Sequence, residues 1–219
     1  MLCRSIFLLL ATAVSSYGQI TEVKPTYGRP ALIKTTQLAE FETLPADRKK
    51  LIEGAIAVAR DSPWLPYLFS GSDPKDGGFD CSGAMYFVMR KAGLGPPRSS
   101  AEQFLWLKEH DRLIETPADA ASLDQPEFKK LQPGDLLFWG GTYAPTDGRK
   151  FNITHVALFL GHEKNDGRAV MINATDGRSY RGTKANGYGV YDFQLPKEAG
   201  KAVFMGYGTP PGITEVQAK

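Results

Sequence analysis

Residues 79–91 read FDCSGAMYFVMRK, and this stretch determines how the rest of the chain is interpreted. Asp80 occupies the position of a helix N-cap, and a compact run of small and apolar residues follows it. Gly93 then provides a suitable C-terminal cap. The sequence therefore predicts a helix over residues 81–91, with Cys81 in its first turn.

The position of Cys81 favours a reactive thiol. Backbone N–H groups at a helix start favour negative charge, so we expect them to lower the pKa of the Cys81 thiol. The preceding loop, residues 70–80, is rich in glycine, and Gly83 leaves space beside the sulfur. Because a single cysteine is by default an inert buried residue, the position alone leaves both interpretations open.

Residues 1–18 have the layout of a secretory signal peptide. A short, positively charged start precedes an apolar run over residues 6–14, and small residues follow. The apolar run is shorter than the roughly 20 residues that a membrane span needs. We therefore expect export to the periplasm or the extracellular space, without stable membrane insertion after cleavage. An uncleaved anchor is the alternative.

Export changes the meaning of the cysteine count. The chain has two cysteines, and Cys3 would leave with the signal peptide. Cys81 would then be the only thiol of a protein sent to a compartment where cysteines usually form disulfides. Such a thiol is either inert and buried or functional.

The composition is typical of a soluble globular protein. Hydrophobic residues make up 42% of the 219 residues, and the formal net charge is +2. No run of Lys or Arg indicates nucleic-acid binding. We expect a monomer with an extended arm over residues 19–45, one domain over residues 46–210 and a C-terminal tail over residues 211–219.

Helical patterns come first in the chain and strand patterns follow. Apolar periodicity predicts two further helices, over residues 45–60 and 101–109. Short apolar runs predict strands, the first of which is opened by the turn signal Pro133-Gly134-Asp135. The predicted strands cover residues 136–139, 153–160, 169–174, 187–193 and 202–207. This order indicates an α+β fold and not alternating βαβ units.

A thiolate nucleophile needs a base, and His155 is the best candidate. It lies near the start of a predicted strand that a loop containing Asn165-Asp166-Gly167 joins to the next strand as a β-hairpin. If the register is even, Asn173 lies directly opposite His155 or diagonally next to it on the same face. Asn173 would then orient the imidazole, as in a Cys-His-Asn triad. An odd register would place the two residues on opposite faces of the sheet.

The other two histidines, His110 and His162, are expected at the surface. His162 differs in parity from His155 and lies beside the hairpin loop, and His110 lies in a charged stretch. The Cys and His residues show none of the ligand spacings of metal sites, and no glycine loop of the phosphate-binding kind is present. We therefore expect neither a metal nor another cofactor.

Six segments in chain order resemble the NlpC-type cell-wall peptidases, which are papain-like bacterial hydrolases that cut the peptide stems of peptidoglycan. They correspond to the nucleophile motif, the tyrosine segment before it, the loop after the nucleophile helix, the strand-opening motif, the histidine strand and the strand with the third polar residue. These are residues 79–83, 67–71, 97–103, 131–138, 155–161 and 171–174. The resemblance covers about residues 48–207. It implies a papain-like α+β fold, with the nucleophile at a helix start and the helices packed on a C-terminal antiparallel sheet.

The resemblance also implies roles for individual residues. Cys81 would be the nucleophile, His155 the base and Asn173 the group that holds the imidazole, with the Cys81 N–H helping to stabilise the oxyanion. In family members that act on free stem peptides, a tyrosine, an aspartate and a serine hold the amino terminus of the substrate. The matching residues here are Tyr67, Asp80 and Ser82. A plain N-cap is the alternative role for Asp80.

Three features depart from the family pattern. Asn173 stands where histidine is more common, Leu-Phe-Ser-Gly follows Tyr67 where Trp-Gly-Gly is usual, and residues 140–152 form a longer loop beside the expected cleft. The leading hypothesis is an exported cysteine endopeptidase that hydrolyses D-γ-glutamyl–diamino acid bonds in peptidoglycan stem peptides or muropeptides. The alternatives are a related cell-wall amidase or muropeptide-recycling peptidase, and an inactive domain that only binds wall peptides.

Overall fold

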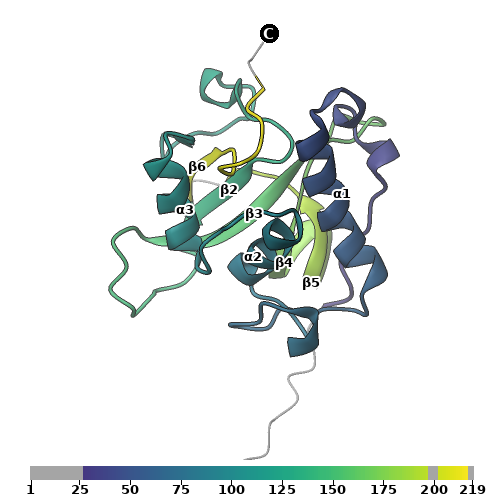
Figure 1. The fold of residues 1–219 in the computed structure, drawn as a ribbon, viewed down its shortest axis with the longest axis horizontal. Helices are drawn as coiled ribbons and strands as arrows, with labels where there is room; N and C mark the ends of the chain where they lie inside the picture. Colours follow the sequence, from purple (N-terminus) through teal and green to yellow (C-terminus); the bar gives the residue numbers. More distant parts are fainter. Residues whose placement is uncertain (1–26, 197–201, 217–219) are drawn as a thin grey trace, which may run out of the picture.

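The computed structural model describes residues 27–196 and 202–216, and the predicted signal peptide lies outside these residues. Within them, three α-helices precede all the strands of a six-stranded antiparallel sheet (Figure 1). The predicted α+β class, with helices first and the sheet after them, is confirmed. Among the described residues, no helix has the length and apolar character that a membrane span requires.

The three helices begin and end close to the predicted positions. They are α1 (Ala46–Asp61), α2 (Cys81–Lys91) and α3 (Ser100–Glu109). The Asp80 carboxylate caps α2 by accepting a hydrogen bond from the Gly83 N–H at 2.6 Å. Gly93 follows the end of α2 with a φ of +93°, a left-handed conformation that glycine adopts without strain. All three predicted helices are therefore confirmed.

The sheet has the strand order β1-β6-β2-β3-β4-β5. The strands are β1 (Leu113–Glu115), β2 (Leu136–Gly140), β3 (Ile153–His162), β4 (Ala169–Tyr180), β5 (Thr183–Asp192) and β6 (Val203–Gly208). The five predicted strands are present, whereas the three-residue β1 is too short to show a pattern in the sequence. The predicted end of β4 at Ala174 is wrong, because β4 continues as a long hairpin with β5 through polar, partly exposed residues that give no apolar signal.

The register of the β3–β4 hairpin is the diagonal one of the two even registers. Leu158 pairs with Ile172, so that Asn173 lies diagonally next to His155 across the two strands. Closer to the turn, the register shifts between Phe159 and Gly161. That irregularity lies beyond the pair and leaves their relation unchanged.

Each face of the sheet is covered by a separate apolar cluster. On one face, α2 packs against β3 and β4, α3 packs against β3, and α1 packs against β5 (Figure 1). The opposite face carries an aromatic cluster that includes Trp139, Phe159, Tyr191 and Phe204. His155 lies at the edge of this second cluster, because its ring centroid is 5.5 Å from that of Trp139.

The described part of the predicted arm is packed on the domain. Gly28 and Ala31 form isolated bridges with Ala185 and Val190 of β5, and Leu38 is fully buried. Residues 27–45 of the predicted arm are therefore packed against the domain. Apolar side chains spaced irregularly between prolines contribute to the core without forming an α-helix or a strand.

Arg48 of α1 joins three distant parts of the chain. Its guanidinium is fully buried and lies 3.0 Å from the carboxylate of Asp135, which begins the turn into β2. It also donates to the carbonyls of Pro133 and Thr214 and to the hydroxyl of Thr209, each at 2.7 Å. The described residues of the predicted C-terminal tail are thus fixed to α1.

Candidate active site

Cys81 lies at the N-terminus of α2 and lines a cavity of about 390 Å³. The thiol is largely buried, with 6% of the residue exposed. Its Sγ is 4.0 Å from the carbonyl oxygen of Thr154 on β3. The residue identified from the sequence as the nucleophile therefore opens onto a cavity of the size that small peptide groups occupy.

The loop before Cys81 packs as closely as its glycines suggest. A Cβ on Gly78 would lie 2.4 Å from the carbonyl oxygen of Pro66, and one on Gly83 would lie 2.0 Å from that of Gly71. The space beside Gly83 is therefore occupied by the Gly71 carbonyl and the Arg98 side chain, and is not open space next to the sulfur. Glycine at position 83 permits the loop to contact the first turn of α2.

The expected lowering of the Cys81 pKa is wrong. Burial, and then the charge of Asp80, raise the pKa of the Cys81 thiol to about 11, although nearby backbone N–H groups of Val156, Ser82 and Cys81 itself act in the opposite direction. Desolvation and the charge of the N-cap carboxylate therefore outweigh the lowering effect of the helix start on the pKa of the thiol. At neutral pH the thiol of the free protein is protonated, and a base must remove the proton.

His155 and Asn173 are in direct contact. Asn173 Nδ2 lies 2.6 Å from His155 Nε2, and both residues are buried. Burial, and then the charge of Arg178, hold the pKa of His155 well below its usual range. The imidazole is therefore neutral at pH 7, which is the form that accepts a proton.

The orientation of the Asn173 amide determines which ring nitrogen is free. For Nδ1 to accept a proton, Nε2 must carry the ring hydrogen and needs an acceptor. Asn173 presents Nδ2 to Nε2, while its buried Oδ1 has no hydrogen-bond partner among the described residues. Exchange of the two amide atoms by a half-turn would place Oδ1 against Nε2, where it can accept the ring hydrogen. A base-competent His155 thus requires Asn173 as the acceptor.

Cys81 lies against the backbone on both sides of His155. Its Sγ is next to the Thr154 carbonyl and the Val156 N–H. Within residues 27–196 and 202–216, no hydrogen bond joins Sγ to the His155 ring. The structure brings His155 and Asn173 together and places the thiol one residue away along β3. Such contacts commonly tighten only when substrate binds.

Tyr67, Asp80 and Ser82 line the same cavity as Cys81. Asp80 accepts hydrogen bonds from the Ser82 hydroxyl at 3.1 Å and from Arg98, whose closer nitrogen is 2.8 Å away. Burial, together with the negative charges of Cys81 and Asp80, raises the pKa of Tyr67. The three residues predicted to bind substrate are therefore neighbours, and Asp80 also serves as the N-cap of α2.

Arg98 was not singled out from the sequence. Besides Asp80, it donates to the Ser82 hydroxyl at 3.0 Å and to the carbonyls of Ser70 and Gly71. It stands in the loop over residues 97–103 that contributes to the family resemblance, which is the only signal that pointed to it. Arg98 partly neutralises the Asp80 carboxylate at the wall of the cavity.

The long loop over residues 140–152 lies beside the cavity, as expected. Tyr143 and Arg149 of this loop line the cavity together with Cys81. Arg149 forms an ion pair with Asp147 at 2.6 Å and donates to the carbonyl of Ile153. The loop is thus anchored to the start of β3, next to the predicted base.

The two remaining histidines lie away from the cavity. His110 is exposed and its Nδ1 is 2.8 Å from the Trp106 carbonyl, whereas the ring of His162 is hydrogen-bonded to Glu40. The prediction that His162 is simply solvated is therefore incomplete. Among the described residues, no group of three or more His, Cys, Asp and Glu side chains is arranged to hold a metal ion.

Known proteins similar to this chain include two that are named as endopeptidases. The chain is 35% identical over 111 residues to the bifunctional muramidase/DL-endopeptidase CwlT of Bacillus subtilis, which covers 51% of this chain and 25% of that protein. It is 30% identical over 137 residues to the probable endopeptidase p60 of Listeria monocytogenes, which covers 62% of this chain and 22% of that protein. The matched region thus spans about a quarter of each relative.

The family match covers the whole candidate site. A solved NLP/P60 structure from Staphylococcus aureus, described as similar to a lipoprotein, is 24% identical with a TM-score of 0.44, over 83% of this chain and 43% of that chain. Residues 65–194, more than half of the chain, match the NlpC/P60 family, and they include Cys81, His155 and Asn173. This protein therefore belongs to the NlpC/P60 family.

Proposed function

We propose that this protein is an exported cysteine endopeptidase that hydrolyses the D-γ-glutamyl–diamino acid bond of peptidoglycan stem peptides. The observation that carries the proposal is the placement of Cys81 at a helix start and in a cavity, against the backbone of β3 next to His155, whose ring is in contact with Asn173. The names of the relatives support the choice of bond, because they include a DL-endopeptidase and a gamma-DL-glutamyl hydrolase. Export rests on the sequence of residues 1–18.

The mechanism begins with two neutral groups. His155 Nδ1 accepts the thiol proton as Cys81 Sγ attacks the scissile carbonyl, so that the charged pair forms only during the reaction. Asn173 Oδ1 accepts a hydrogen bond from Nε2–H and stabilises the imidazolium. The Cys81 N–H, which belongs to the first turn of α2 and has no partner within the helix, is available to the oxyanion.

The second half of the reaction returns the proton. His155 donates it to the nitrogen of the leaving amine as the C–N bond breaks, leaving a thioester between Cys81 and the glutamyl half. Water, deprotonated by His155, then attacks the thioester and releases the free carboxylic acid and the thiol. The sequence of steps uses only Cys81, His155, Asn173 and water.

Tyr67, Asp80 and Ser82 would bind a free amino terminus of the stem peptide. The Asp80 carboxylate, the Ser82 hydroxyl and the Tyr67 side chain border one cavity, and an ammonium group is the complementary ligand. An incoming ammonium would share Asp80 with Arg98, which lies 2.8 Å from it. This arrangement supports a preference for free muropeptides over stems that are still attached at the amino end.

Digestion of purified muropeptides followed by mass spectrometry tests the proposal. The wild type should release products cut after the D-γ-glutamyl residue, and Cys81→Ala should release none. Cleavage that survives in Cys81→Ala would exclude Cys81 as the nucleophile. Products cut at the sugar–peptide junction would indicate an amidase, and binding without turnover in the wild type would indicate an inactive binding domain.

A further inference from the structure

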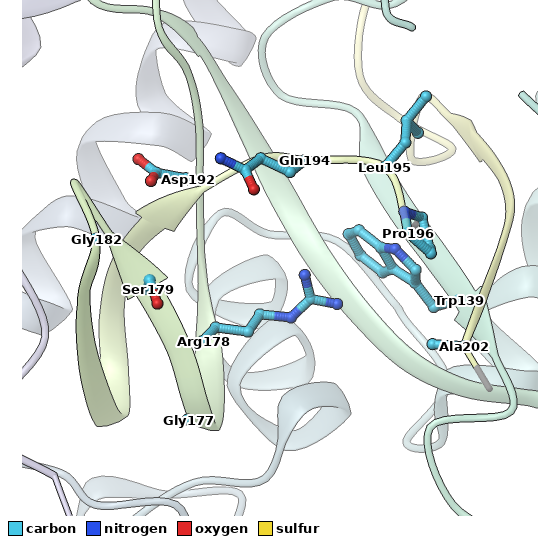
Figure 2. Close-up of a pocket in the computed structure, with 10 residues that line it drawn as sticks. All are labelled: Trp139, Gly177, Arg178, Ser179, Gly182, Asp192, Gln194, Leu195, Pro196 and Ala202. Carbon is cyan, nitrogen blue, oxygen red and sulfur yellow. The ribbon is translucent and has the colours of Figure 1, made fainter. Parts of the chain in front are cut away.

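A second cavity, of about 420 Å³, lies on the aromatic side of the sheet (Figure 2). Its walls come from the extended β4–β5 hairpin, from Trp139 on β2 and from the segment that follows β5. Gln194 contributes a polar side chain, and Leu195 and Pro196 contribute apolar ones. No residue lines both this cavity and the one that contains Cys81.

Arg178 places a positive charge in this cavity. Its side chain reaches from β4 toward Trp139, with the guanidinium carbon 4.5 Å from the ring centroid (Figure 2). Among the described residues, Arg178 has neither an ion-pair nor a hydrogen-bond partner, whereas its neighbours Arg168 and Arg181 are both ion-paired. The acidic residue of the same cavity, Asp192, is already engaged by Arg168 at 3.4 Å.

An arginine in this arrangement is prepared to bind a carboxylate. Stacking on Trp139 occupies one face of the guanidinium and leaves its N–H edge for a planar, bidentate partner. Burial lowers the pKa of Arg178 to about 10, so the side chain is still charged at neutral pH. A partly buried charge without a counter-ion is costly, and an anionic ligand would remove that cost.

The position of Arg178 relates it to the predicted base. The Trp139 ring contacts both the His155 ring and the Arg178 guanidinium, and the Arg178 charge contributes to the low pKa of His155. In the proposed reaction, His155 protonates the leaving amine, so the leaving half of the substrate must lie beside His155. The amino terminus of the substrate would lie in the other cavity, next to Asp80.

We propose that Arg178 binds a carboxylate carried by the leaving half of the peptide substrate and so determines which stem peptides are cleaved. The inference rests on the proposed function. The carboxylate has two sources in a stem tripeptide: the carboxyl terminus of the diamino acid, or a second carboxylate on its side chain. The chemistry is the same for both, and synthetic substrates separate them.

Four synthetic peptides provide the test, each beginning with L-Ala-γ-D-Glu. The first ends in L-Lys with a free carboxyl terminus, and the second is its carboxamide. The third ends in meso-diaminopimelic acid amidated at the chain terminus, so that only the side-chain carboxylate remains. The fourth ends in free L-Lys but carries an amide in place of the glutamyl α-carboxylate. Steady-state kcat/KM is measured for each.

We expect the wild type to cleave at least one of the first and third peptides about 10- to 100-fold more efficiently than the second, as a charge-assisted pair would give. Arg178→Gln should abolish this preference, and Arg178→Lys should retain part of it. Lys184→Gln, which removes an exposed cation from the same hairpin, should leave it unchanged. The ratio between peptides is the readout, because a general loss of stability lowers all rates equally.

Two results would overturn the inference while leaving the proposed function intact. One is an equal preference in the wild type and Arg178→Gln. The other is that Arg178→Gln abolishes only the preference for the first peptide over the fourth, which would place the carboxylate on the acyl half. If the wild type cleaves none of the peptides, the proposed function fails. Calorimetric binding of the same peptides to Cys81→Ala, with and without Arg178→Gln, still decides whether Arg178 selects a carboxylate.

Discussion

The thiol of Cys81 and the imidazole of His155 are both uncharged at neutral pH. Burial dominates both shifts, raising the pKa of the thiol to about 11 and holding that of the imidazole well below its usual range. The chemistry of the site is therefore that of a proton transfer coupled to attack, not of a preformed ion pair. Asn173 contacts the His155 ring directly, so a substitution at Asn173 can change the pKa of His155.

Asn173→Asp should move the pH dependence of catalysis. In the wild type, the acid limb of kcat/KM should lie well below pH 6.5, because His155 stays neutral and able to accept a proton down to its lowered pKa. A carboxylate against the ring favours the imidazolium and raises the pKa of His155, which moves the limb to higher pH. Asn165→Asp, in the exposed hairpin turn, is the matched control and should not move it. An unchanged limb in Asn173→Asp would contradict this account of the base.

At the level of the elements, α2 shows how packing overrides helix propensity. Replacing a helical glycine by alanine normally stabilises a helix by about 0.5–1 kcal/mol. Gly83→Ala should instead destabilise the protein by about 1–3 kcal/mol, because the new Cβ would lie 2.0 Å from the Gly71 carbonyl oxygen. Gly54→Ala in α1, where nothing lies within 4 Å of the new Cβ, should be stabilising. Urea unfolding of the two variants measures the contrast, and equal changes would show that the Gly71 loop moves freely.

The contact between β3 and the arm should make stability depend on pH. The hydrogen bond that His162 donates to Glu40 raises the pKa of His162. The stabilisation is therefore fully present below the unfolded pKa of about 6.5 and is lost as pH rises through the folded value. Burial acts to raise the pKa of Glu40, but hydrogen bonds from His162 lower it overall. The contribution of the Glu40 carboxylate to stability is therefore lost only at acid pH. Since both side chains are partly exposed, the effect should stay below about 1 kcal/mol.

Comparison of the wild type with His162→Gln tests this contact. The difference in the free energy of unfolding between the two proteins should be larger at pH 6 than at pH 8.5. His110→Gln, which removes an exposed histidine bonded to a backbone carbonyl, should show no such dependence. A difference for His162→Gln that is constant over this range would mean that the ring contributes only as a neutral hydrogen-bonding group.

The sequence predicts long, periodic helices and strands well. It predicts poorly those properties that depend on contacts between residues distant in the chain. The three helices follow from apolar periodicity, and strand parity limits His155 and Asn173 to a direct or a diagonal relation if the register is even; the structure has the diagonal one. The sign of the Cys81 pKa shift does not follow from such patterns, because it depends on how completely the fold excludes water from the thiol. Arg98 and Arg178 are single basic residues without a surrounding pattern, and only their neighbours in space give them a role.

At the scale of the whole molecule, the site depends on how the arm, the helices and the C-terminal residues are fastened to one sheet. Gly28 and Ala31 bridge to the β5 edge, and the Arg48 cluster ties α1 to the turn before β2 and to Thr214. β2 carries Trp139, which contacts both His155 and Arg178. The geometry of both cavities is therefore connected to a buried ion pair on the far end of β2.

Arg48→Met should destabilise the protein by about 3–5 kcal/mol, because it leaves the buried Asp135 carboxylate without its cation. Met fills a similar volume, so the loss reflects the charge and its hydrogen bonds more than a cavity. Arg48→Met combined with Asp135→Leu should recover part of the loss, since no buried charge then remains unpaired. Arg60→Met, which breaks an exposed ion pair with Asp61 in the same helix, is the matched control and should leave the urea midpoint unchanged. The Arg48 cluster does not stabilise the fold as its burial indicates if the urea midpoint of the single Arg48 variant equals that of this control. The same conclusion follows if the double variant is less stable than the single one.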